Sequence, residues 1–261
     1  MDLGIDGNTA LCTAASSGLG LASAKALAAE GADVAICGRT EAHLEEAKAG
    51  IDEAGNGDVL AVEADITDPD HVSAFVEQTA EELGGIDHVV TSAGGPPSGP
   101  FEAMGDEDWY DAYDLLVMSA VWTLREAHPY LEASDAGTAV AITSRSVREV
   151  IDDLVLSNSV RRAVIGLVKT LSREYAPGVR VNAVLPGAHE TARIENLIDA
   201  AVERGDFDDY EDGLADWAAD IPLDRIGDPR ELGDVVAFLS SERASYVTGT
   251  ASPVDGGSMR S

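Results

Sequence analysis

The 261-residue sequence predicts one α/β domain, a doubly wound parallel sheet with helices on both faces. Short apolar segments alternate with longer amphipathic segments along most of the chain, which is typical of a parallel sheet. The short segments are apolar throughout rather than at every second residue, as expected for strands covered on both faces. Neither a linker nor an internal repeat divides the chain, so we interpret residues 1–261 as a single domain.

The first half of the chain predicts four strands separated by three helices. The expected strands are the apolar segments 9–15, 33–38, 59–65 and 86–94. The first helix is expected to end at Gly31 and the second, 41–55, at Gly55, because glycine is common directly after a helix. Pro69 has the position of a helix start in the third helix, 68–84.

The second half continues the alternation with one interruption. The expected elements are a helix at 106–131, a strand at 137–144, a helix at 157–175, a strand at 179–187, a helix at 229–242 and a strand at 251–257. The polar segment 188–227 breaks this rhythm, and we expect it to form a mobile lid over a substrate.

The chain is strongly acidic. Its 48 acidic and 17 basic residues give a net charge of −31, and the acidic residues are spread along the sequence. Such a surface repels phosphate backbones and anionic lipids, so we expect neither nucleic acid nor a membrane as a partner. Any single acidic run is interpreted as a solvated face. Acidity over a whole domain favours the hypothesis of a salt-loving source, because high salt screens the self-repulsion.

Other features favour a soluble, cytoplasmic protein without a metal site. Cys12 and Cys37 lie in apolar runs without a CxxC partner, which indicates buried free thiols. The five histidines form no cluster with metal-ligand spacing. No apolar run approaches the roughly 20 residues that span a bilayer, and the N-terminus lacks the basic and apolar regions of a secretory signal.

The loop TAASSGLG (13–20), between the first strand and the first helix, has the composition of a phosphate-binding turn. Gly18 and Gly20 allow a tight turn and the close approach of a ligand, and the helix N-terminus offers N–H groups to a pyrophosphate. The loop therefore indicates a Rossmann-type dinucleotide site, and a tight turn that binds nothing is the alternative.

The segment CGRT after the second strand indicates which dinucleotide binds. Gly38 stands where a carboxylate would bind the ribose 2′-hydroxyl, and Arg39 follows it. A guanidinium is suited to a 2′-phosphate, so the segment favours NADP over NAD. The alternative is an exposed arginine on a loop.

These motifs, with EADITD, SAGG, AITS, VRVNAVLPG and YVTGTASPVDGG, make nearly the whole chain resemble the short-chain dehydrogenase/reductase family, and within it the 3-oxoacyl-carrier-protein-reductase-like members. The resemblance implies an NAD(P)-dependent oxidoreductase that acts on a small-molecule carbonyl or secondary alcohol and forms a homodimer or homotetramer. It also implies that the cofactor is bound by Ala14, Ser16, Ser17, Gly18, Leu19, Gly20, Arg39, Asp65, Ile66, Ser92, Ala93, Gly94, Pro186 and Gly187.

The sequence departs from the family pattern in its active site. The family places an Asn in the long central helix, then a Ser, then a Tyr with a Lys four residues on. These positions carry Leu116, Ser144, Ser157 and Arg161, so only the Ser is kept, and we take Ser144, Ser157 and Arg161 as the catalytic candidates. Ala14 replaces the first glycine of the loop, which costs about 1 kcal/mol unless its φ is negative.

These replacements change how a proton reaches the new alkoxide. A Tyr beside an ammonium can donate a proton near neutral pH, whereas a serine hydroxyl is a much weaker acid and an arginine stays protonated. Arg161 can instead bind a ribose hydroxyl or stabilise an oxyanion. His189 is one candidate donor, and a loop histidine without a chemical role is the alternative.

The sequence therefore leaves two alternative functions: an active NADP-dependent oxidoreductase, and a cofactor-binding pseudoenzyme that serves as a structural or regulatory subunit. Arg145 and Arg148 follow Ser144 and are expected to face the substrate cleft, and with Arg161 and Arg162 they suggest an anionic substrate. Unchanged affinity for anionic and neutral carbonyl ligands in an Arg145→Ala variant would refute that hypothesis. Arg162 is interpreted as pairing with the acidic surface or with a partner subunit.

Overall fold

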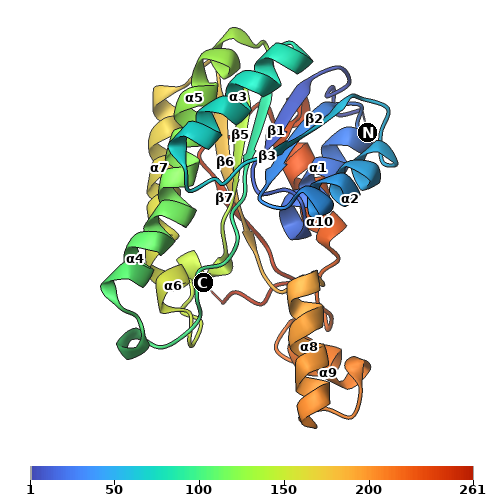
Figure 1. The fold of residues 1–261 in the computed structure, drawn as a ribbon, viewed down its shortest axis with the longest axis vertical. Helices are drawn as coiled ribbons and strands as arrows, with labels where there is room; N and C mark the ends of the chain where they lie inside the picture. Colours follow the sequence, from blue (N-terminus) through green and yellow to red (C-terminus); the bar gives the residue numbers. More distant parts are fainter. Residues whose placement is uncertain (1, 261) are drawn as a thin grey trace.

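A parallel sheet of seven strands forms the centre of the protein (Figure 1). The structure is a computed structural model that describes residues 2–260, without the side chain of Arg193; positions 1 and 261 of the expected domain lie outside this range. The strand order is β3-β2-β1-β4-β5-β6-β7. The strands are β1 (Thr9–Cys12), β2 (Asp33–Gly38), β3 (Val59–Glu63), β4 (His88–Thr91), β5 (Thr138–Ile142), β6 (Arg180–Pro186) and β7 (Ala251–Val254).

Helices cover both faces of this sheet, which confirms the predicted doubly wound fold (Figure 1). One face carries α1 (Gly18–Ala29), α2 (Glu41–Asp52) and α10 (Pro229–Ser240). The other face carries α3 (Pro69–Leu83), α5 (Ser119–Ala133) and α7 (Arg162–Glu174). The remaining helices are α4 (Asp106–Tyr113), α6 (Val155–Val160), α8 (Ala192–Arg204) and α9 (Tyr210–Ala218).

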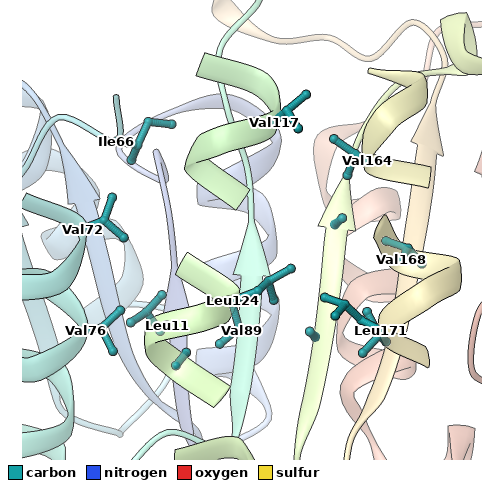
Figure 2. Packing of buried hydrophobic residues seen from close by; sticks show 14 of the residues in the cluster. Leu11, Ile66, Val72, Val76, Val89, Val117, Leu124, Val164, Val168 and Leu171 are labelled. Carbon is teal, nitrogen blue, oxygen red and sulfur yellow. The ribbon is translucent and has the colours of Figure 1, made fainter. Parts of the chain in front are cut away.

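Successive strand residues supply two separate cores. In β1, Leu11 packs into the core beneath α3, α5 and α7, while Ala10 and Cys12 pack into the core beneath α1, α2 and α10. Figure 2 shows the first of these cores, where Leu124 and Val168 lie near the strand residues. Because neighbouring side chains of a strand point to opposite faces, uniformly apolar strands are required here.

Several helix boundaries differ from the sequence-based expectations. The expected helix 106–131 is interrupted by a π-helical segment, Asp114–Met118. The expected helix 157–175 begins earlier, at Val155, and its regular hydrogen bonding is broken at Arg161, which joins α6 to α7. Gly55 does not end α2, which stops at Asp52; a Cβ at Gly55 would collide with the carbonyl oxygen of Ala28. That glycine permits close packing instead.

The segment 188–227 forms an arm beyond the sheet that contains α8 and α9 (Figure 1). Its two ends are joined by a parallel bridge between His189 and Gly227. The Gly227 amide donates to the carbonyl of Ala188 at 2.9 Å, and the Glu190 amide donates to the carbonyl of Gly227 at 2.8 Å. The arm therefore leaves and rejoins the sheet domain at one point.

The two cysteines are buried and free, as predicted. Burial raises the pKa of Cys37 to about 12 and raises that of Cys12 further. Thiols in this state stay protonated and are poor nucleophiles.

Among residues 2–260, the structure contains no helix with both the length and the apolar character needed to cross a membrane.

His88 lies at the amino end of β4 and is 1% exposed. The Asn8 side-chain amide donates to its Nε2 at 2.9 Å, and its Nδ1 lies 2.8 Å from the Thr138 hydroxyl. Burial lowers the pKa of His88 to about 4; the Asp87 charge raises it and the Arg180 charge lowers it, but burial prevails. The imidazole is therefore a neutral structural group.

We expect the protein to lose about 3 kcal/mol of unfolding free energy through His88 as the pH falls from 6.5 toward 4. In this range the unfolded chain binds a proton that the folded protein excludes, so the contribution is complete above pH 6.5. Denaturant unfolding between pH 8 and pH 4 measures it. A His88→Gln variant should show a correspondingly smaller loss, and equal losses in the two proteins would contradict the assignment.

Candidate active site

The carboxyl ends of β1, β4, β5 and β6 bring the predicted site segments to one edge of the sheet. The strand order reverses beside β1, because β2 lies on one side of it and β4 on the other. Such a switch point is where open parallel sheets bind ligands. Two adjoining cavities lie at this edge, one of about 270 Å³ and one of about 440 Å³. We call them the cofactor cavity and the substrate cavity.

The cofactor cavity is lined by most of the predicted cofactor residues around the loop and the end of β4. They are Ala14, Ser17, Gly18, Leu19, Gly20, Ser92, Ala93 and Gly94. Pro186 and Gly187 instead line the substrate cavity, with Leu19 shared by both. Ser16, Arg39, Asp65 and Ile66 lie outside both cavities.

The geometry of the loop fits a pyrophosphate. Gly18 has a φ of 58°, and a Cβ at Gly20 would come within 3.0 Å of the Ala14 carbonyl oxygen. Ser17 precedes α1 without capping it through its side chain, and the first turn of α1 contains no acidic residue. The N–H groups of this turn are therefore available to an anion.

Ala14 has a φ of 45°. Because this angle is positive, replacing the glycine at this position by alanine carries a conformational cost. A non-glycine residue in this left-handed region costs about 1–2 kcal/mol.

Arg39 and Asp65 lie beyond β2 and β3. Arg39 is exposed. Burial raises the pKa of Asp65, but hydrogen bonds from the amide and hydroxyl of Thr67, with the charges of Arg39 and His71, outweigh burial and leave the pKa below its ordinary value. Asp65 therefore stays ionised close to Arg39, with its Oδ1 already accepting both Thr67 hydrogen bonds at 2.9 and 2.8 Å.

Arg161 lines both cavities and is only 9% exposed. Its Nη2 donates to the Gly94 carbonyl at 3.0 Å and its Nη1 to the Thr143 carbonyl at 3.3 Å. Its Nε donates to the Ser157 hydroxyl at 3.2 Å. The guanidinium thus ties together the ends of β4 and β5 and one of the catalytic candidates.

Ser144 and Ser157 both line the substrate cavity beside Arg161, so the three catalytic candidates are brought together. The Ser144 hydroxyl accepts a hydrogen bond from the Ser146 amide at 3.1 Å. The Ser157 hydroxyl lies 3.0 Å from that of Ser146, which is fully buried. Sequence reasoning missed Ser146; its only signal is its place two residues after Ser144.

Leu116 takes the place of the family's asparagine in the π-helical segment. It is 4% exposed and lines a small internal cavity together with Arg161. An apolar side chain there has no hydrogen bond to offer.

His189 lies in the wall of the substrate cavity at the base of the arm and is 4% exposed. Its Nδ1 is 3.2 Å from the carbonyl oxygen of Gly187. Burial lowers the pKa of His189; the Gly187 carbonyl and the charges of Glu231 and Asp228 raise it, without reversing that direction. A neutral imidazole is a poor proton donor, so the structure does not favour this candidate.

Two of the four arginines do not reach the substrate cavity, which corrects the expectation for Arg148. Its Nη2 donates to the carbonyl of Ala251 at 2.8 Å. Arg162 donates through Nε to the carbonyl of Asn158 at 2.9 Å, in its own helix region. Arg145 and Arg161 do line the cavity.

The part of the chain that the structure describes contains no group of three His, Cys, Asp or Glu side chains arranged to hold a metal ion.

Comparisons with known proteins agree with this architecture. A family model described as "Enoyl-(Acyl carrier protein) reductase" matches residues 13–259. The chain is 34% identical to Oxidoreductase UcpA of Escherichia coli (strain K12), over 97% of this chain and 95% of that protein. It superposes with a TM-score of 0.96 on L-sorbose reductase from Gluconobacter frateurii complexed with NADPH and L-sorbose, at 32% identity and full coverage of both chains.

A second similar structure bears on the altered active site. It is an NADPH-bound short-chain oxidoreductase from Pseudomonas aeruginosa PAO1 that contains an atypical catalytic centre. The TM-score is 0.89 and the identity 30%, over 97% of each chain.

Proposed function

The chain belongs to the short-chain dehydrogenase/reductase family, and on that basis we propose that it transfers hydride between NADP(H) and a small-molecule carbonyl or secondary alcohol through a centre made of Ser144, Ser157 and Arg161. The observation that carries the proposal is the position of Arg161, which borders both cavities and contacts Ser157.

The cofactor supplies or accepts the hydride when bound. The N-terminus of α1 and the loop before it would hold the pyrophosphate, and Arg39 would bind the 2′-phosphate. NAD is less suited, because Gly38 offers no carboxylate to a ribose hydroxyl.

Ser157 is placed to pass a proton to the substrate oxygen. A hydroxyl has one proton and two lone pairs. Arg161 donates to the Ser157 oxygen, and the Ser146 hydroxyl lies 3.0 Å from it, where either hydroxyl can be the donor. When Ser146 donates, the Ser157 proton is left for the cavity. During reduction the carbonyl π bond breaks and a C–H bond forms, while the oxygen takes the Ser157 proton. A water in the cavity returns a proton to Ser157 and leaves as hydroxide to the bulk solvent. The Arg161 charge stabilises the oxyanion as it develops.

Exchanging Arg39 for aspartate tests the cofactor assignment. We expect Arg39→Asp to weaken NADPH binding by about 10- to 100-fold, because a charge-assisted contact with the 2′-phosphate is replaced by repulsion. NADH binding should improve relative to NADPH. Fluorescence titration in multimolar KCl measures both. The control is Arg162→Asp, with the same charge change outside both cavities; an equal loss in the control would refute a direct contact.

Turnover of NADPH with a panel of ketones in high salt tests the activity itself. Reduction of at least one ketone is expected. Tight NADPH binding without turnover of any of them would instead favour the alternative, a cofactor-binding pseudoenzyme with a structural or regulatory role.

We also propose that the arm, 188–227, acts as the substrate lid. Ile194, Leu197 and Trp217 of the arm line the substrate cavity, and the bridge between His189 and Gly227 at its base gives it a natural hinge. Unchanged protection of the arm from hydrogen exchange after addition of NADPH and substrate would refute closure.

Three further properties complete the proposal. The net charge of −31 supports a salt-loving source, so we expect the unfolding free energy to rise between low and multimolar KCl, and equal values would refute this.

Two buried free thiols support a cytoplasmic location, which cell fractionation would test. Family membership supports a homodimer or homotetramer, and a monomer by light scattering in multimolar salt would contradict it.

A further inference from the structure

The substrate cavity has an apolar wall on each side. Ile151 and Leu154 line it from the sheet domain, and Leu197 and Trp217 line it from the arm. Leu197 is 49% exposed and Trp217 is 38% exposed, although both are large apolar residues. Apolar side chains that face each other across an open cavity are typical of a site that takes an apolar ligand body.

The charge of this cavity is opposite to that of the protein as a whole. Its described lining includes Arg145 and Arg161 and no carboxylate, although acidic residues outnumber basic ones by 48 to 17 in the sequence. A cation in such a place attracts anions that the rest of the surface repels.

The two arginines differ in what their guanidinium groups do. Arg161 donates to Gly94, Thr143 and Ser157 and is committed to holding the site together. Arg145 has one ion-pair contact among the described residues, with Glu149 at 3.9 Å, and its side chain is 31% exposed. A pair at that distance and exposure is weak. Arg145 can therefore turn to a ligand at little cost.

We propose that the substrate is an oxo acid with an apolar body, or the corresponding hydroxy acid, whose carboxylate binds Arg145. The carbonyl lies at Ser144 and Ser157, and the apolar body lies between Leu154 and Trp217. Ser144 and Arg145 are neighbours in the chain and both line the cavity, so we assign the carbonyl and the carboxylate to one small ligand, as in 2-oxo and 3-oxo acids. This inference rests on the proposed function, because it identifies the substrate class of the same site.

Binding to the enzyme saturated with NADP⁺ tests the proposal. An oxo compound cannot be reduced by oxidised cofactor, so affinity is measured apart from activity. The probes are 2-oxo-4-phenylbutanoate, its uncharged ethyl ester, and pyruvate, which has the charge without the apolar body. Calorimetry in the lowest salt that keeps the protein folded should show the phenylbutanoate binding at least 10-fold more tightly than either of the others. Equal affinity for acid and ester would overturn the proposal.

Two variants assign the contacts. Arg145→Gln should weaken binding of the acid by about 10-fold or more and leave the ester within about two-fold, because a charge-assisted contact is lost. Arg148→Gln, a neighbouring arginine outside the cavity, should change neither. Trp217→Ala should weaken acid and ester alike and leave pyruvate unchanged. Equal losses of acid and ester in Arg145→Gln would overturn the role of Arg145.

The outcome is distinguishable from failure of the proposed function. If NADPH reduces the ester as well as the acid, the oxidoreductase stands and the oxo-acid assignment falls. If NADP⁺ does not bind in the first place, the proposed function falls before the substrate class is reached.

Discussion

Replacing Arg161 by methionine should lower kcat by about 10²- to 10³-fold and weaken NADPH binding at least 10-fold. Methionine keeps much of the length of the side chain and removes all of its donors. The Gly94 and Thr143 carbonyls and the Ser157 hydroxyl would lose the hydrogen bonds that join the ends of β4 and β5. Each buried group left without a partner costs about 1–3 kcal/mol. Both losses follow because Arg161 borders both cavities.

Steady-state kinetics and fluorescence titration measure the two effects. Arg162→Met is the matched control, because the same change is made one residue away at a side chain outside the cavities. An Arg161→Lys variant keeps the charge but not the forked donor geometry, so it should recover part of kcat. An Arg161→Met protein that is folded and retains full turnover would exclude Arg161 from the centre.

Replacing Ser157 by tyrosine should raise kcat near neutral pH by about 10- to 100-fold, whereas Arg161→Met lowers it. A phenol is a stronger acid than a serine hydroxyl, and the adjacent Arg161 cation would lower its pKa further. The substrate cavity of about 440 Å³ lies next to Ser157 and gives the ring a place to enter. The Ser157→Tyr variant should also gain a pH profile in which reduction declines as the phenol ionises.

The control for this gain is Ser157→Phe, which adds the ring without the hydroxyl. Reduction should not rise in that variant at any pH. If the tyrosine and phenylalanine variants behave alike, position 157 does not face the reacting oxygen. A gain in the tyrosine variant would also show that the cofactor and substrate cavities are otherwise competent.

Much of the fold could be predicted because apolar periodicity determines it. All seven strands lie within predicted segments, but every prediction except 33–38 runs past the carboxyl end of its strand, as in 9–15 against Thr9–Cys12 and 86–94 against His88–Thr91. The residues beyond these two strands are small or apolar as well, so periodicity does not separate them from the sheet. They leave it to line the cofactor cavity, as Ala14 and Gly94 do.

The site was only partly predictable, because the sequence does not show where a side chain points or which backbone angles a loop residue adopts. Ser144, Ser157 and Arg161 could be predicted because they occupy the family's catalytic positions in the sequence, and the structure brings them to one cavity. The direction of Arg148 depends on the 3₁₀ turn Arg145–Val147, which has no periodic signal. Nor does any pattern disclose the positive φ of Ala14.

The bridge between His189 and Gly227 has a consequence for how such an enzyme changes over time. Because the two ends of the arm meet in one ladder of two hydrogen bonds, residues 194–218, in α8 and α9, can be replaced, lengthened or shortened without altering the register of β6. The contacts of Leu223 with Gly256 and of Arg225 with Glu231 lie outside this range and stay in place. Residues 194–218 are in this sense an exchangeable cassette. Transplanting the corresponding residues of a relative would leave the lining of the cofactor cavity unchanged and would give a chimaera that keeps its cofactor and acquires a new substrate.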